Sequence, residues 1–123
     1  MDLNPKKLVD LAPEWIADND GRIHGIRFHC PIHTTVPGNP DFECTHSVGF
    51  TNPPAGGPPQ AYWSTTWARS GETFEMLRLT PSIRCLGFQN AAGGEDGGCR
   101  WHGYVGGSGG EVPGMVTTLA DSR

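Results

Sequence analysis

The sequence predicts a mostly β protein: a small antiparallel sheet or sandwich-like domain, rich in loops, with one short N-terminal helix and a stabilising metal ion. The 123 residues include 18 glycines and 11 prolines, which disfavour long helices. Between these breakers, apolar and polar residues alternate in short runs, as they do in half-buried strands. Only 36% of the residues are hydrophobic, so the core is thin and a metal crosslink would help to hold one shape.

The expected elements follow the chain in order. Asn4 and Pro5 suit the start of a helix, which we place at residues 5–12. Alternation predicts strands at residues 22–30, 44–50, 62–67, 73–83 and 100–105, and a glycine-rich hairpin loop then leads to residues 111–112. We expect a single β domain over residues 1–112 and a flexible C-terminal tail over residues 113–123.

Charge and hydropathy exclude several classes of protein. The formal net charge is −4, and the nine Lys and Arg residues are scattered rather than gathered into the basic stripe of a nucleic-acid-binding protein. The sequence contains no apolar run long enough for a membrane span and no signal-peptide pattern near Met1. We therefore expect neither nucleic acid nor membrane as a partner, and a place in the cytoplasm or in a particle assembled there.

Cysteine and histidine residues fall into three short motifs. These are Cys30-Pro-Ile-His33, Cys44-Thr-His46 and Cys99-Arg-Trp-His102. Two residues between ligands allow a tight turn to aim both side chains at one ion, and one intervening residue on a strand places both on the same face. In a reducing compartment such thiols more often bind metal than form disulfides, although four cysteines could also form two disulfides.

Thiolate and imidazole ligands favour zinc, which takes four of them in a tetrahedron. The motifs supply six candidates, so at least two should lie outside the first coordination shell. We favour Cys30, His33, His46 and His102, with Cys44 and Cys99 as the next candidates. Cys85 has no neighbouring histidine and is expected in the core. The alternative without a metal treats the cysteines as core residues and the histidines as surface groups.

Two other metal chemistries are open. Cys44-Thr-His46 and Cys99-Arg-Trp-His102-Gly resemble the two ligand loops of Rieske proteins, which hold a [2Fe–2S] cluster through two Cys and two His. The spacing is longer here than in that family. A zinc-dependent hydrolase would instead need an open coordination position and a carboxylate base, for which Glu43 is one candidate. No hydrolase motif accompanies the cysteines, and we assign no catalytic residue.

Several segments together resemble an uncharacterised family of small proteins from tailed bacteriophages and prophages. The resemblance covers most of the chain up to Val112, and the segments that carry it are residues 8–15, 25–31, 45–50, 67–75, 79–83, 101–105 and 110–112. Thr80-Pro-Ser-Ile83 and His102-Gly-Tyr-Val105 are the most specific of them. The resemblance implies a phage or prophage origin and a zinc-binding β fold, without implying an activity.

The sequence as a whole favours binding over catalysis. We expect a phage-encoded zinc protein that acts as a minor virion or assembly component, or as an accessory protein directed at the host. Its partner would then be a phage structural protein or a host protein, and its location the host-cell cytoplasm or the virion.

Overall fold

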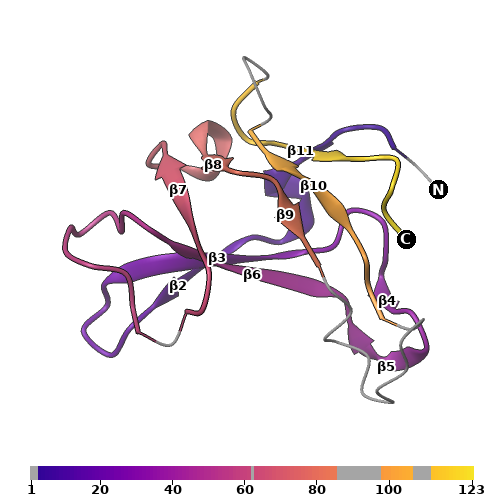
Figure 1. Cartoon of the computed structure of the whole chain (residues 1–123), viewed down its shortest axis with the longest axis horizontal. Helices are drawn as coiled ribbons and strands as arrows, with labels where there is room; N and C mark the ends of the chain where they lie inside the picture. The colour runs from indigo at the N-terminus through magenta and orange to yellow at the C-terminus, as the bar shows by residue number, and fades with distance from the viewer. Residues whose placement is uncertain (1–2, 62, 86–97, 107–111) are drawn as a thin grey trace.

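A computed structural model describes residues 3–61, 63–85, 98–106 and 112–123. The described chain consists mainly of strands in antiparallel and mixed sheets (Figure 1), which confirms the predicted fold class. No helix in these residues has the length and apolar character needed to cross a bilayer.

The larger sheet has five strands in the order β2-β3-β6-β7-β8. Its strands are β2 (Glu14–Ala17), β3 (Ile23–His29), β6 (Thr45–Phe50), β7 (Thr66–Ser70) and β8 (Arg78–Thr80). All neighbours are antiparallel except β6 and β7, which run parallel. The long β3–β6 ladder forms the middle of the sheet, and its register positions the candidate site described below.

A second sheet has four strands in the order β1-β11-β10-β9. They are β1 (Lys6–Lys7), β9 (Ile83–Arg84), β10 (His102–Val105) and β11 (Met115–Thr118). Strand β11 lies between β1 and β10, and its Val116 is fully buried. The expectation of a flexible tail over residues 113–123 is therefore wrong, because Val116 fills the core and β11 completes the backbone hydrogen bonding of both neighbours.

A two-stranded hairpin of β4 (Thr35–Val36) and β5 (Asn39–Glu43) lies between the strands predicted at 22–30 and 44–50, where the sequence pattern predicted no strand. Gly38 makes its turn with a positive φ of 83°, a conformation that glycine adopts without steric cost. The hairpin leads the chain directly to Cys44, and it therefore delivers one of the candidate metal ligands.

The predicted N-terminal α-helix is also wrong, because the segment forms other secondary structure. Residues 5–12 contain strand β1 and a single turn of 3-10 helix, η1 (Leu8–Leu11). The residue before η1 is Lys7, whose side chain makes no capping hydrogen bond, and Pro13 follows closely after the turn. Without a cap, and with a proline this near, the segment is too short to continue as an α-helix. Glu14–Ala17 then forms an edge strand, for which the sequence pattern gave no prediction.

The strand expected at residues 73–83 is divided into three pieces. They are a 3-10 turn, η2 (Phe74–Met76), and the strands β8 and β9, which belong to different sheets. Pro81 lies between the two strands and has no amide hydrogen to offer to a ladder. The strand expected at 62–67 begins later, at Thr66, and Tyr62 lies outside the described residues. Most of the glycine-rich hairpin loop expected before residues 111–112 also lies outside them.

The hydrophobic core joins the two large sheets. Its largest fully buried side chains are Trp101, Phe28, Phe50, Leu8, Ile26, Leu77 and Leu79. Trp101, immediately before β10, packs edge-to-face on Phe28 of β3 with ring centroids 5.9 Å apart. The thiols of Cys30, Cys44 and Cys99 belong to the same cluster, so the candidate site is continuous with the core.

Candidate metal centre

Four buried side chains converge at one end of the β3–β6 ladder. They are Cys30, Cys44, His46 and Cys99, and their candidate ligand atoms all lie within 4.8 Å of one another. None of the four exposes more than 6% of its surface. The chain thus contains a buried group of three thiols and one imidazole that could hold a metal ion.

The register of the β3–β6 ladder explains three of the four positions. Phe28 pairs with His46 and His29 with Thr45, and the amide of Cys30 then donates a 2.8 Å hydrogen bond to the carbonyl of Cys44. Because side chains alternate along a strand, Cys44 and His46 share one face of the sheet. Cys30 lies across the ladder from Cys44, so antiparallel pairing alone brings these donors together.

The fourth donor comes from the other sheet. Cys99 precedes β10 and follows Gly98, whose φ is 79° and whose amide donates to the carbonyl of Pro37. The amide of Trp101 donates to Cys99 Sγ at 3.4 Å, which favours the charged, thiolate form of that sulfur. A metal held by all four residues would therefore connect the two sheets.

The distances within the group fit one tetrahedral ion. Two sulfurs that each lie about 2.3 Å from a tetrahedral zinc are about 3.8 Å apart, and a sulfur and an imidazole nitrogen are about 3.6 Å apart. Cys30 Sγ and Cys99 Sγ are 3.7 Å apart, as are Cys99 Sγ and His46 Nε2. A disulfide would need sulfurs about 2.05 Å apart, and all four cysteines are free thiols.

The environment of the four side chains favours the negatively charged thiolate form of two of the cysteines. Hydrogen bonds from Cys44 and then from Cys99 lower the pKa of Cys30 far below that of an ordinary thiol, while the same contact with Cys30 raises the pKa of Cys44. The contact with Cys30 alone would raise the pKa of Cys99, but contacts with Cys44 and Cys85 outweigh it and lower that pKa to about 5. Buried thiolates at this density need a cation beside them.

His46 responds to the same charges. Burial alone would lower its pKa, but contacts with Cys30, Cys85 and Cys99 raise it. Without a metal the imidazole, like the Cys44 thiol, would thus hold a proton. A divalent cation can replace that proton and satisfy all of the donors at once.

Two further residues border the group. His33 Nδ1 lies 3.6 Å from Cys30 Sγ and 4.0 Å from Cys44 Sγ, and the ring is half-buried. Cys85, which was expected in the core, is instead half-buried against it, and its side chain contacts His46 and Cys99. No local motif marks Cys85: its position follows from the pairing of its amide with the carbonyl of Trp101.

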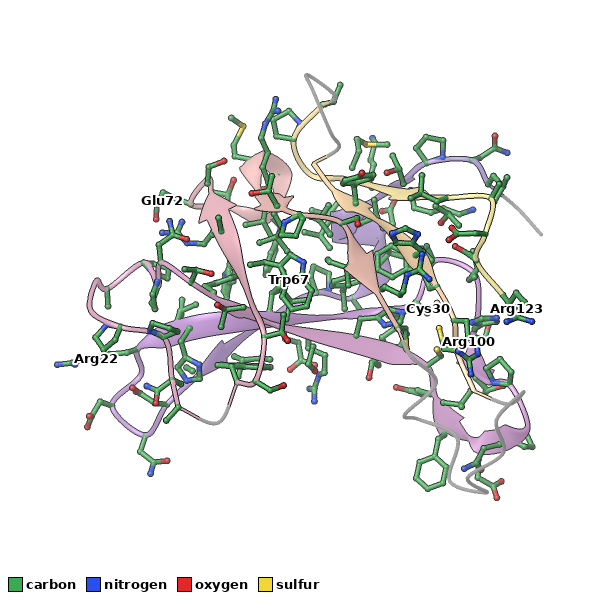
Figure 2. All side chains as sticks on the ribbon, viewed as in Figure 1. Arg22, Cys30, Trp67, Glu72, Arg100 and Arg123 are labelled. Carbon is green, nitrogen blue, oxygen red and sulfur yellow. The ribbon has the colours of Figure 1, made fainter. Side chains whose placement is uncertain are left out.

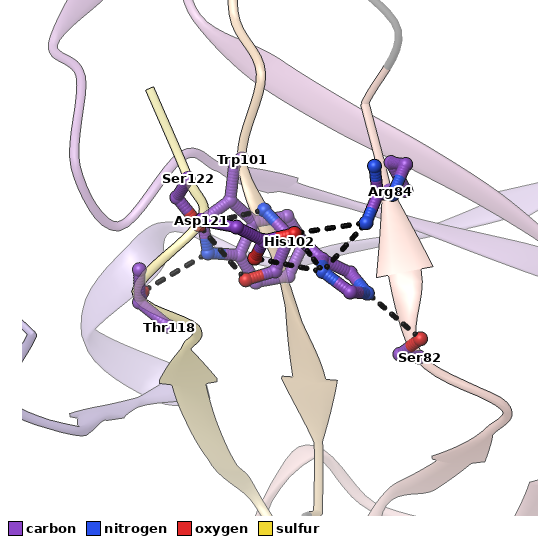
Figure 3. Close-up of polar contacts among 7 residues, drawn as sticks. All are labelled: Ser82, Arg84, Trp101, His102, Thr118, Asp121 and Ser122. Carbon is purple, nitrogen blue, oxygen red and sulfur yellow. Dashed lines mark hydrogen bonds and ion pairs between the residues drawn. The ribbon is translucent and has the colours of Figure 1, made fainter.

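His102 does not join the group, which corrects our preferred set. Its Nδ1 lies 3.0 Å from Asp121 Oδ1 and its Nε2 lies 3.0 Å from Ser82 Oγ (Figure 3). The chain from Cys99 to His102 is extended rather than turned, so residues three apart point to opposite faces. Trp101 takes the inner position instead and packs on His46 with ring centroids 4.9 Å apart.

The contacts of His102 tie the C-terminal segment to β10. Its amide donates to Ser122 Oγ, which in turn donates to the carbonyl of His102. The hydrogen bond between His102 and Asp121 lowers the pKa of the Asp121 carboxyl group.

Fold and site together define a small β protein with a buried centre of three cysteines and one histidine. Comparisons with protein-family models, with curated proteins and with solved structures find no match to this chain.

Proposed function

We propose that this chain is a zinc protein in which the metal is structural, and that it acts by binding another protein. One observation carries the proposal: three thiols and one imidazole, all buried, lie within 4.8 Å of one another, three of them at the end of the β3–β6 ladder and the fourth just before β10. Such donors suit zinc, and four of them close a tetrahedral shell. Binding of about 10–16 kcal/mol would then exceed the stability of an ordinary small domain, about 5–15 kcal/mol.

The same group argues against the two alternative chemistries. The Rieske-type ligand set suggested by the two motifs uses His102 as its second histidine, but His102 is held by Asp121 and Ser82. A hydrolytic zinc requires an open position and a nearby base, whereas the group found among the described residues contains no carboxylate and already offers four ligands. A closed site supports a role in folding rather than in catalysis.

The kind of partner follows from the family resemblance. Because that resemblance implies a phage or prophage origin, we propose a phage structural protein or a host protein as the partner. The chain would act as a minor virion or assembly component or as a host-directed accessory protein, in the host cytoplasm or in the virion. The excess of acidic residues supports a protein partner rather than a nucleic acid.

Elemental analysis of protein purified without chelator tests the metal. We expect one zinc per chain, a colourless solution, and unfolding when a strong chelator removes the metal, followed by circular dichroism. Iron with acid-labile sulfide and a red-brown colour would instead support the two-iron cluster. Protein that contains no metal and melts identically with and without chelator would contradict the proposal.

Affinity capture from phage-infected cells tests the partner. The bait is the zinc-loaded chain, and the matched control is the same chain after metal removal. A phage structural or host protein retained only by the zinc-loaded form would support the proposed role. Equal recovery of every protein on both baits would contradict it.

A further inference from the structure

The chain has four cysteines, and the structure brings all of them to the metal centre although a metal shell that includes His46 needs only three. Cys30, Cys44 and Cys99 are buried members of the donor group, whereas Cys85 is half-buried and borders it. Together with His46, the three buried thiols already offer the four ligands of a tetrahedral ion. Cys85 is therefore a surplus thiol that lies within reach of the centre.

Backbone pairing places Cys85 beside Cys99. In the β9–β10 register Arg84 lies opposite His102 (Figure 3). The amide of Cys85 continues this pairing with a 2.8 Å hydrogen bond to the carbonyl of Trp101. Because Cys99 is two residues from Trp101 in an extended chain, its side chain shares a face with the one that Cys85 opposes. The contact between the Cys85 and Cys99 side chains agrees with this register.

Cys85 is also the most accessible of the four thiols. Cys44 and Cys99 expose none of their surface and Cys30 exposes 6%, whereas Cys85 is half-buried. Cys85 also lines a cavity of about 80 Å³, and one water needs about 10–15 Å³ of such space. A molecule as small as hydrogen peroxide can therefore reach this sulfur, while the core encloses the other three.

The thiol beside Cys85 is the donor that connects the two sides of the fold. Cys99 comes from the β10 side, and its sulfur lies 3.7 Å from both Cys30 Sγ and His46 Nε2. Figure 2 shows Cys30 close to Arg100, the residue that follows Cys99. A disulfide between Cys99 and Cys85 would withdraw Cys99 from the ion, because the thiolate is the form of cysteine that binds metal. Only the donors of the β3–β6 ladder would then remain.

We propose that Cys85 is a site of oxidation by hydroperoxides, and that the disulfide it then forms with Cys99 releases the metal. The inference rests on the proposed zinc centre and adds a regulatory input to it. In the reduced state the chain holds zinc and keeps the two sheets connected. Oxidation removes one ligand, and the affinity of the protein for zinc falls.

The reaction balances in two steps. The Cys85 sulfur attacks one oxygen of hydrogen peroxide, the O–O bond breaks, and Cys85 becomes a sulfenic acid while water leaves. The Cys99 thiolate then attacks the Cys85 sulfur, the S–S bond forms, and the departing hydroxide takes a proton from solvent to give a second water. The two sulfurs together lose two electrons, which the peroxide gains.

Peroxide treatment of the zinc-loaded full chain in the presence of a chromophoric chelator tests the inference. We expect zinc release together with the loss of two thiols, because losing one ligand should weaken zinc binding about 60-fold or more. No Lys or Arg lies between Arg84 and Arg100, so trypsin leaves both cysteines on the peptide 85–100. After oxidation this peptide should be lighter by two hydrogens, and dithiothreitol with added zinc should restore both the thiols and the bound metal.

Cys85→Ser is the diagnostic variant. It should bind zinc within about tenfold of the parent but release it to peroxide about tenfold or more slowly, because no disulfide with Cys99 can form. His33→Ala is the matched control: His33 also borders the group but offers no thiol, and the variant should release zinc at close to the parental rate. Zinc content and circular dichroism before treatment report whether each variant is folded, and Cys85→Ala repeats the test with a second side chain.

Three results would overturn the inference. They are equal rates of zinc release from Cys85→Ser and the parent, a disulfide that joins any other pair of cysteines, and a parent that keeps its zinc and all four thiols at peroxide concentrations that oxidise free cysteine. Zinc content before treatment separates this inference from the proposed function. A chain purified without zinc contradicts the structural metal, whereas the mass of the peptide 85–100 still reports the disulfide.

Discussion

Replacing Cys99 by serine is the sharpest test of the metal centre. Cys99 is fully buried and is the donor that the β10 side of the fold contributes, while Cys30, Cys44 and His46 come from the β3–β6 ladder. Its sulfur lies 3.7 Å from both Cys30 Sγ and His46 Nε2. Serine keeps the size of the side chain but removes a soft ligand that zinc prefers.

The expected magnitude follows from dividing the metal affinity among its ligands. Structural zinc binding of about 10–16 kcal/mol corresponds to about 2.5–4 kcal/mol for each of four ligands. With a factor of ten for every 1.4 kcal/mol, Cys99→Ser should weaken zinc binding by about 60- to 700-fold. The variant should also melt earlier, because the connection between the two sheets passes through this sulfur.

Competition with a chromophoric chelator measures the affinity, and cobalt substitution reports the coordination. Tetrahedral cobalt with three thiolates absorbs in the visible range, and the thiolate-to-metal band should shrink in Cys99→Ser. Cys85→Ser and His33→Ala are the matched controls. Both residues border the group without belonging to it, and each variant should bind zinc within about tenfold of the parent.

One pattern of results would refute this assignment. If Cys99→Ser keeps parental zinc affinity while Cys85→Ser or His33→Ala loses it, the ion is held by a different set of donors. The coordination inferred from the four converging side chains would then be wrong.

Three further predictions address the surroundings of the centre. His102→Ala should retain full zinc content yet lower stability by about 1–3 kcal/mol through its lost bonds to Asp121 and Ser82; a loss of zinc measured by elemental analysis would contradict this. Gly103→Ala should lower the free energy of unfolding by about 1–3 kcal/mol or more, because a methyl group there would overlap the Thr117 carbonyl and the Trp101 ring. An unchanged melting temperature would exclude this packing. Acidification should release zinc, because protons and metal compete for the thiolates. The zinc affinity should fall up to about tenfold per pH unit for each proton taken up, and a pH-independent affinity in a chelator titration would show that thiolates are not the ligands.

Much of the fold followed from local pattern. Alternation identified the core strands β3, β6 and β10, with ends that differ by one or two residues from those observed. Elements that form only by pairing with distant segments were predicted wrongly. The sequence of β11 carries no distinctive strand pattern, and it becomes a central strand because β1 and β10 lie on either side of it. Similarly, Glu14–Ala17 is a strand because it pairs with the edge of β3, and no local sequence pattern predicts that pairing.

The sequence alone determined which chemistry is present: thiols and imidazoles in three short motifs, in a glycine- and proline-rich chain. It could not determine which of them meet, because the spacing of Cys99 and His102 fits two geometries. In a tight turn both side chains can bind one ion, whereas in an extended strand they point to opposite faces. The tertiary structure chose the second geometry, since extending the chain buries Trp101 against Phe28 and His46. It also brought Cys85 beside the centre and aligned Arg100 with Arg123, both through backbone pairing between segments far apart in sequence.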